Sequence, residues 1–206
     1  MFMLYAVIAG VAVGLLARGR LGALADLRVR WAPLAVAALL LQVALFSAPV
    51  SAVIGSIGPP IYVGSTAAVL VVVLRNVRIP GLALVAIGAA SNLAAIAANG
   101  GYMPASADAL ASLGASISAG YSNSSATAAP ALAPLTDIFA LPAWLPLANI
   151  FSIGDVLIGA GIACAIVVQM RAGPPGRSQP ADDARAVRAD TSLQRSGASV
   201  PWSHGG

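Results

Sequence analysis

The stretch Ile150 to Met170, "IFSIGDVLIGAGIACAIVVQM", decides the fold class, because it is apolar for long enough to cross a membrane. A bilayer core of about 30 Å needs roughly 20 apolar residues in a helix, and slightly shorter runs also suffice. The stretch carries one acidic residue, Asp155, near its start. It therefore predicts a transmembrane helix that places one carboxylate close to a membrane surface.

Asp155 has a local explanation. Ser152 and Asp155 have the S-x-x-[DE] spacing of a capping box, in which each side chain bonds the other residue's backbone N–H at a helix start. The positive end of the helix dipole also stabilises a negative charge there. However, ionisable residues in membrane segments are functional candidates by default. Two interpretations stay open: a purely structural cap, or a cap that also belongs to a binding site.

The composition of the whole chain is typical of a membrane protein. Of its 206 residues, 59% are hydrophobic and only 9% are charged, which is too apolar for a soluble domain with a polar shell. The basic residues are all arginine, and they neither interleave with stacking aromatic residues nor form one continuous patch, so nucleic acid is not expected as a partner. The only cysteine, Cys164, lies in an apolar run, which excludes an intrachain disulfide.

Four other apolar segments accompany the first, so the sequence predicts an all-α fold, a five-helix transmembrane bundle. Residues 99–149 would form a long outer loop, whose apolar, proline-punctuated second part is expected to fold at the membrane surface. Residues 172–206 have little apolar content and are expected to form a disordered tail. The expected spans are residues 1–17, 31–53, 59–74, 80–98 and 153–170.

The positions of the arginines predict the orientation. All eleven lie in the first loop, in the third loop or in the tail, and the alternate connections contain none. Because arginine near the ends of spans is retained in the cytoplasm, the N-terminus is expected outside and the C-terminus inside. The lipid bilayer is then the first partner. A membrane-protein partner or a second copy of the chain is a further expectation.

Polar residues of the outer half predict a site. Asn92 lies within a predicted span and needs a partner inside the bundle, and Asn99 follows seven residues later on nearly the same helix face. Both Asn99 and Asp155 belong to the outer leaflet. The sequence therefore predicts an outward-facing polar pocket beneath the outer loop, and it predicts no catalytic residue, metal ligand or cofactor. The residues expected to line this pocket are Asn99, Tyr102, Asp137 and Asp155.

Three ordered motifs carry a resemblance to a known family. They are "NGGYMP" at Asn99–Pro104, "LTDIFALP" at Leu135–Pro142 and "FSIGDVLI" at Phe151–Ile158. With these motifs the chain resembles the domain-of-unknown-function family 5317, a family of uncharacterised bacterial membrane proteins. The resemblance implies a multi-pass protein of the bacterial cytoplasmic membrane and implies no activity.

Three functions remain compatible with these residues. The leading hypothesis is a non-enzymatic protein, related to transport, that binds a small molecule or an ion in the outer pocket. The first alternative is a structural or assembly subunit of a membrane complex, in which the polar residues only cap and join helices. The second alternative is a membrane enzyme that acts on a lipid-linked substrate, with Asp155 as general base.

Overall fold

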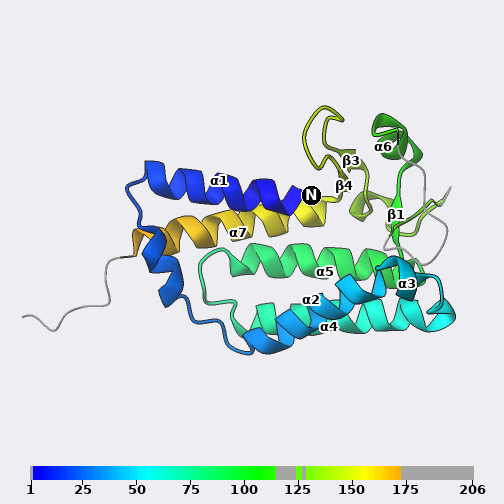
Figure 1. The fold of residues 1–206 in the computed structure, drawn as a ribbon, viewed down its shortest axis with the longest axis horizontal. Helices are drawn as coiled ribbons and strands as arrows, with labels where there is room; N and C mark the ends of the chain where they lie inside the picture. The colour runs from blue at the N-terminus through cyan, green and yellow to red at the C-terminus, as the bar shows by residue number, and fades with distance from the viewer. Residues whose placement is uncertain (1, 115–123, 127–128, 173–206) are drawn as a thin grey trace, which may run out of the picture. The chain divides into compact units, whose positions relative to one another are not determined.

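The computed structural model describes residues 2–114, 124–126 and 129–172 (Figure 1). The chain is mostly helical there, as predicted. The tail expected at residues 172–206 lies outside the described residues from residue 173 onward, and part of the outer loop also lies outside them. The long helices are α1 (Phe2–Leu16), α2 (Ala32–Leu45), α4 (Gly58–Arg75), α5 (Leu82–Ala98) and α7 (Ile153–Arg171).

Shorter elements connect the long helices. Strand β1 pairs with β2 in parallel, and β3 pairs with β4 in antiparallel orientation. Most of these elements belong to the segment between α5 and α7, which the sequence predicted to be an outer loop. The short elements are η1 (Leu21–Asp26), α3 (Ala48–Ser51), η2 (Gly55–Ile57), β1 (Met103–Ala105), α6 (Ala107–Ser112), β2 (Ser124–Ala126), η3 (Ala133–Leu135), β3 (Phe139–Ala140) and β4 (Ile150–Phe151).

The long helices contact one another in the order α1, α7, α5, α4, α2, which we call the helix row. Figure 1 shows α7 between α1 and α5. Small residues allow the close approach of α7 to both neighbours. A Cβ atom on Gly10 of α1 would lie 2.9 Å from the Cα atom of Ala163, and one on Gly161 of α7 would lie 2.5 Å from the carbonyl oxygen of Gly81. The glycines of α1, Gly10 and Gly14, therefore face α7.

The second helix ends earlier than the sequence predicts. A span over residues 31–53 was expected, whereas α2 ends at Leu45 and a separate short helix, α3, follows. Pro49 accounts for this break, because proline has no N–H to donate and its ring clashes with the carbonyl four residues earlier, here that of Leu45. The fourth predicted span also begins later, at Leu82, because Gly81 has a left-handed φ of 88°.

Among the described residues, two helical segments are long and apolar enough to cross a membrane, Gly55–Arg75 and Ile153–Arg171. The helices α1, α2 and α5 are apolar but shorter. Gln42, a polar residue of α2, donates hydrogen bonds from Nε2 to Ser65 Oγ at 3.1 Å and to Thr66 Oγ1 at 3.3 Å on α4. The polar residue within this apolar segment thus joins two neighbouring helices.

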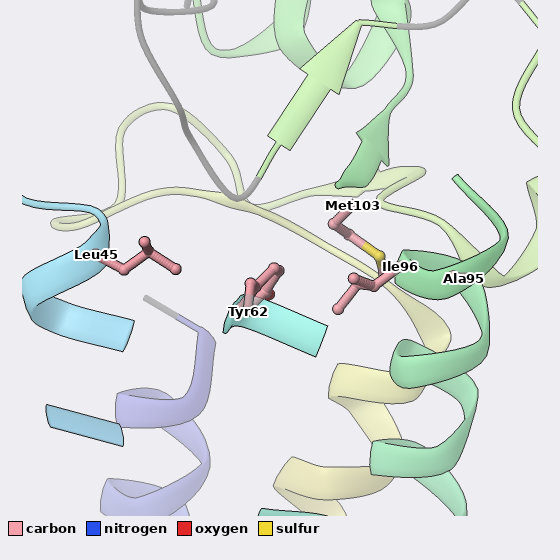
Figure 2. Close-up of a cluster of buried hydrophobic side chains, with 5 residues drawn as sticks. All are labelled: Leu45, Tyr62, Ala95, Ile96 and Met103. Atoms are coloured by element: carbon pink, nitrogen blue, oxygen red, sulfur yellow. The ribbon is translucent and has the colours of Figure 1, made fainter. Parts of the chain in front are cut away.

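A buried apolar cluster lies beneath the connection after α5 (Figure 2). It joins the ends of α2 and α5 to the first part of α4 and to β1. Tyr62 contacts Phe46 edge to face, with ring centroids 4.9 Å apart. The cluster fixes the outer segment on the helices. Its members are Leu45, Tyr62, Ala95, Ile96 and Met103.

Candidate functional site

The start of α7 forms both hydrogen bonds of a capping box. The Ser152 backbone N–H donates to Oδ2 of Asp155 at 3.0 Å, and the Asp155 N–H donates to Oγ of Ser152 at 3.1 Å. Ser152 is fully buried, and Asp155 is partly buried. The local sequence pattern is thus sufficient to explain why the helix begins here.

Asn92 of α5 joins this cap to the neighbouring helix. Its Nδ2 donates to the second carboxylate oxygen of Asp155 at 2.9 Å, and its Oδ1 accepts from Oγ of Ser152 at 2.8 Å. The amide therefore satisfies both a hydroxyl and a carboxylate at the close contact between α5 and α7. This confirms the expectation that Asn92 finds a partner inside the helix assembly, and it identifies that partner as the cap.

Replacing Asn92 with leucine is expected to destabilise the protein by about 2 kcal/mol, because it leaves Ser152 and Asp155 without their partner on α5. The measurement is the midpoint of denaturation by sodium dodecyl sulfate in mixed micelles. Asn149→Leu is not a suitable control, because that amide also binds backbone groups. The matched control is Gln42→Leu, which removes an amide from a different helix pair and is expected to cost about 1 kcal/mol. Equal midpoints for Asn92→Leu and the wild type would contradict the assigned role.

A cavity of about 320 Å³ lies beside the cap. Asp137 and Asp155 both line it, one from the outer segment and one from α7. Apolar side chains at the beginning of α1 form another part of its wall. Two carboxyl groups, an amide and an apolar wall thus surround one small space. The lining residues are Phe2, Met3, Leu4, Asp137, Asn149, Ile150 and Asp155.

The backbone of Asp137 is fixed on both sides. Its N–H donates to the carbonyl of Pro104 at 2.9 Å, and its carbonyl accepts from the N–H of Ser106 at 3.0 Å. The residue is 6% exposed. Within the described part of the chain, the carboxyl group of Asp137 has no hydrogen-bond partner. A buried carboxyl group without a partner is costly when ionised, so it favours either a proton or a cation in this cavity.

Burial and the negative charge of Asp155 together raise the pKa of Asp137 from 3.8 to about 7. A carboxyl group with this pKa changes its charge near neutral pH. Desolvation is the larger cause, because the group is removed from water and lacks compensating donors. The cavity can therefore gain or lose a negative charge under physiological conditions.

The structure does not bring all four predicted site residues together. Asp137 and Asp155 line the cavity, but Asn99 and Tyr102 do not. Asn99 donates from Nδ2 to the carbonyls of Ala95 and Ala131 at 2.8 and 2.9 Å, and its Oδ1 accepts from the N–H of Ala131 at 2.9 Å. Its side chain thus anchors the outer segment to the end of α5. Tyr102 packs against the apolar cluster of Figure 2.

The comparisons with known proteins identify a family. The model of DUF5317, a family of unknown function, matches residues 26–167, well over half of the chain. The chain belongs to this family. No curated protein and no solved structure matches it significantly. The DUF5317 match contains Asn92, Asp137, Asn149 and Asp155, while the α1 residues of the cavity precede it.

Five of the residues that line the cavity were not predicted from the sequence, among them Asn149 and Phe2. Asn149 accepts a 2.8 Å hydrogen bond at Oδ1 from the Phe2 N–H, and so connects the start of α1 to the outer segment. The Phe2 ring stacks on Phe151 with centroids 4.5 Å apart, and Phe151 stacks on Phe139 at 5.6 Å. No local motif of DUF5317 pointed to this contact. An asparagine just before an apolar run was the only available signal.

Proposed function

We propose that this DUF5317 protein is a five-span protein of the bacterial cytoplasmic membrane, with its N-terminus outside. The ends of the helices support the proposal. The arginines among the described residues lie near the ends of α1, α4 and α7 or the starts of α2 and α5, which form one end of the helix row. The start of α7, which contains Asp155, and β3, which follows Asp137, lie at the other end (Figure 1). The position of the described arginines at one end agrees with retention of arginine in the cytoplasm.

We further propose that the outer cavity binds a small organic cation, such as a protonated amine, as a binding or transport-related step. The observation that carries this proposal is that Asp137 and Asp155 face one cavity of about 320 Å³. A volume of this size is at the lower end of the range for small-molecule sites. The ammonium group of the ligand would compensate the carboxylates, and its apolar part would contact α1.

The composition of the cavity favours an organic cation over a metal ion. In the described ranges, no group of three or more His, Cys, Asp and Glu residues could hold a metal. Divalent metal ions in proteins need more oxygen ligands than two carboxylates and one amide supply. Phe2, Leu4 and Ile150 instead provide an apolar wall next to the carboxylates. A ligand with one ammonium group and a short hydrocarbon chain matches both the carboxylates and the apolar wall.

Calorimetric titration with n-butylammonium tests this proposal. The protein is placed in lipid nanodiscs, and saturable binding is expected at pH 8. Because ionisation of Asp137 creates the attracting charge and its pKa is about 7, the affinity is expected to fall about tenfold between pH 8 and pH 6. Asp137→Asn is expected to abolish both the binding and its dependence on pH.

Asp108→Asn provides the matched control, because Asp108 is an exposed aspartate of the same outer segment and does not line the cavity. This variant is expected to bind n-butylammonium as the wild type does. Uncharged n-butanol tests whether the positive charge of the ligand matters. Equal binding of n-butanol, or equal losses in the two aspartate variants, would refute the proposal.

A further inference from the structure

A second cavity lies at the opposite end of the helix row, where α2 begins and α4 ends. It measures about 790 Å³. We call it the arginine basin, because four arginines line it and no acidic residue does. The outer cavity and the proposed amine ligand do not account for this basin. The lining residues are Arg28, Arg30, Trp31, Val71, Leu74, Arg75, Asn76, Val77, Arg78 and Ile79.

Asn76 fixes the two sides of the basin to each other. Its Nδ2 donates to the carbonyl of Arg30 at 2.8 Å, and its Oδ1 accepts from the N–H of Arg30 at 2.8 Å. The same Nδ2 also donates to the carbonyl of Val72 at 2.8 Å, and the residue is only 5% exposed. The segment before α2 is therefore tied to the end of α4 through a buried side chain. These contacts fix the two sides of the basin in place within the fold.

Trp31 orients one arginine in the basin. The guanidinium carbon of Arg75 lies 5.7 Å from the centroid of the Trp31 ring. Such stacking holds a guanidinium by its face and leaves its N–H donors free at the edge. Trp31 itself has a left-handed φ of 61°, which is uncommon for a bulky residue. The Asn76 contact with the neighbouring Arg30 supports this backbone conformation.

The positive charges of the basin are not paired within the described part of the chain. Arg28, Arg30, Arg75 and Arg78 are exposed, and none forms an ion pair with an aspartate of the described ranges. Like charges that converge on one cavity raise the local concentration of anions. Arginine donors match the oxygen atoms of a phosphate group in pairs, which makes phosphate the best-suited anion.

We propose that the arginine basin binds the phosphate group of an anionic membrane lipid. This inference rests on the membrane placement proposed above, because it is this placement that brings the basin to the level of the cytoplasmic headgroups. Basic pockets between helices on that side are suited to anionic headgroups. The apolar residues Val71 and Leu74 on α4 extend from the basin along the helix, where an acyl chain would lie.

Trp31 provides the signal for a test. The chain contains three tryptophans, so a variant with Trp144→Phe and Trp202→Phe retains only the one in the basin. In phosphatidylcholine nanodiscs, dihexanoyl phosphatidylglycerol is expected to change the Trp31 fluorescence saturably, whereas dihexanoyl phosphatidylcholine is not. Equal responses to the two lipids would overturn the proposal, because the net charge of the headgroup would then have no effect.

A matched pair of double variants separates the basin from the general positive charge of this end. Each basin arginine is expected to contribute about 1 kcal/mol, so Arg28→Gln with Arg78→Gln weakens binding of the anionic lipid about 30-fold. Arg20→Gln with Arg171→Gln removes the same charge outside the basin and is expected to weaken binding by less than about threefold. Equal effects of the two pairs would overturn the proposal. If the first pair fails to fold, Arg78→Gln alone is expected to weaken binding about fivefold.

Titration with inorganic phosphate tests whether the basin binds the phosphate of a lipid headgroup or free phosphate. Tighter saturation by inorganic phosphate than by the lipid headgroup would overturn the lipid assignment and identify a site for free phosphate. Weaker saturation supports the lipid. Binding of n-butylammonium by the Arg28→Gln, Arg78→Gln protein is expected to be unchanged, so a failure at the basin can be distinguished from a failure at the outer cavity.

Discussion

Gly161→Ala is expected to destabilise the protein by about 3 kcal/mol, because the added methyl group has no space between α5 and α7. It would lie 2.5 Å from the carbonyl oxygen of Gly81 and 2.9 Å from the backbone nitrogen of Val85. Both contacts are with backbone atoms, which cannot turn away as a flexible side chain can. The helices must therefore separate. The measurement is the midpoint of denaturation by sodium dodecyl sulfate in mixed micelles.

The control for this prediction is Gly64→Ala on α4. A Cβ atom at Gly64 meets nothing within 4 Å. Alanine is the better helix former, so this variant is expected to be neutral or more stable by up to about 1 kcal/mol. The separation of α5 and α7 would also weaken the contact of Asn92 with the α7 cap. Similar midpoints for Gly161→Ala and Gly64→Ala would show that the close approach of α5 and α7 does not limit stability.

Asp137→Asn is expected to remove a loss of stability that the wild type suffers above neutral pH. The folded pKa of Asp137, about 7, is above the ordinary value of 3.8, so the folded state holds the proton more tightly. The stability that this proton confers is fully present below about pH 4 and is lost as the pH rises through about 7. A difference of about three units corresponds to an upper limit of about 4 kcal/mol. Asparagine is nearly isosteric and never ionises.

Thermal denaturation between pH 4.5 and 8.5 measures this effect. The wild type is expected to melt at a lower temperature at pH 8.5 than at pH 4.5, and Asp137→Asn is expected to show a much smaller difference. Asp108→Asn keeps the wild-type dependence, because Asp108 is exposed and does not line the cavity. If Asp137→Asn retains the full dependence on pH, another group is responsible and the burial of Asp137 does not control its ionisation.

The parts of the site that depend on local sequence could be predicted. Ser152 and Asp155 are three residues apart, and a capping box needs only that spacing and a helix start. The partner of Asp155 could not be predicted, because it depends on which helix lies next to α7. The seven-residue spacing of Asn92 and Asn99 placed both on one face of α5 but did not say which of them reaches the cap. The structure assigns Asn92 to the cap and Asn99 to the outer segment.

The limits of the fold prediction have a similar cause. Apolar length located the long helices, but it could not show that Pro49 separates α3 from α2, because both pieces are apolar. Hydropathy also does not indicate which helices are neighbours in space. That order follows from close contacts such as Gly10 with Ala163 and Gly161 with Gly81, which join residues far apart in the chain. The cavity could not be predicted without this order, because its wall includes residues from α1 and from α7.

The place of α7 between α1 and α5 determines when the protein can assemble during its synthesis. Among the described long helices, α1 is made before the others, and the helix against which it mainly packs, α7, is made after them. Until residue 153 and those after it have been translated, α1 lacks that neighbour and Asn92 lacks the cap that it binds. A nascent chain that stops in the outer segment therefore has neither the complete cavity nor the complete helix row. Helix α1 therefore cannot complete its packing until α7 has been made.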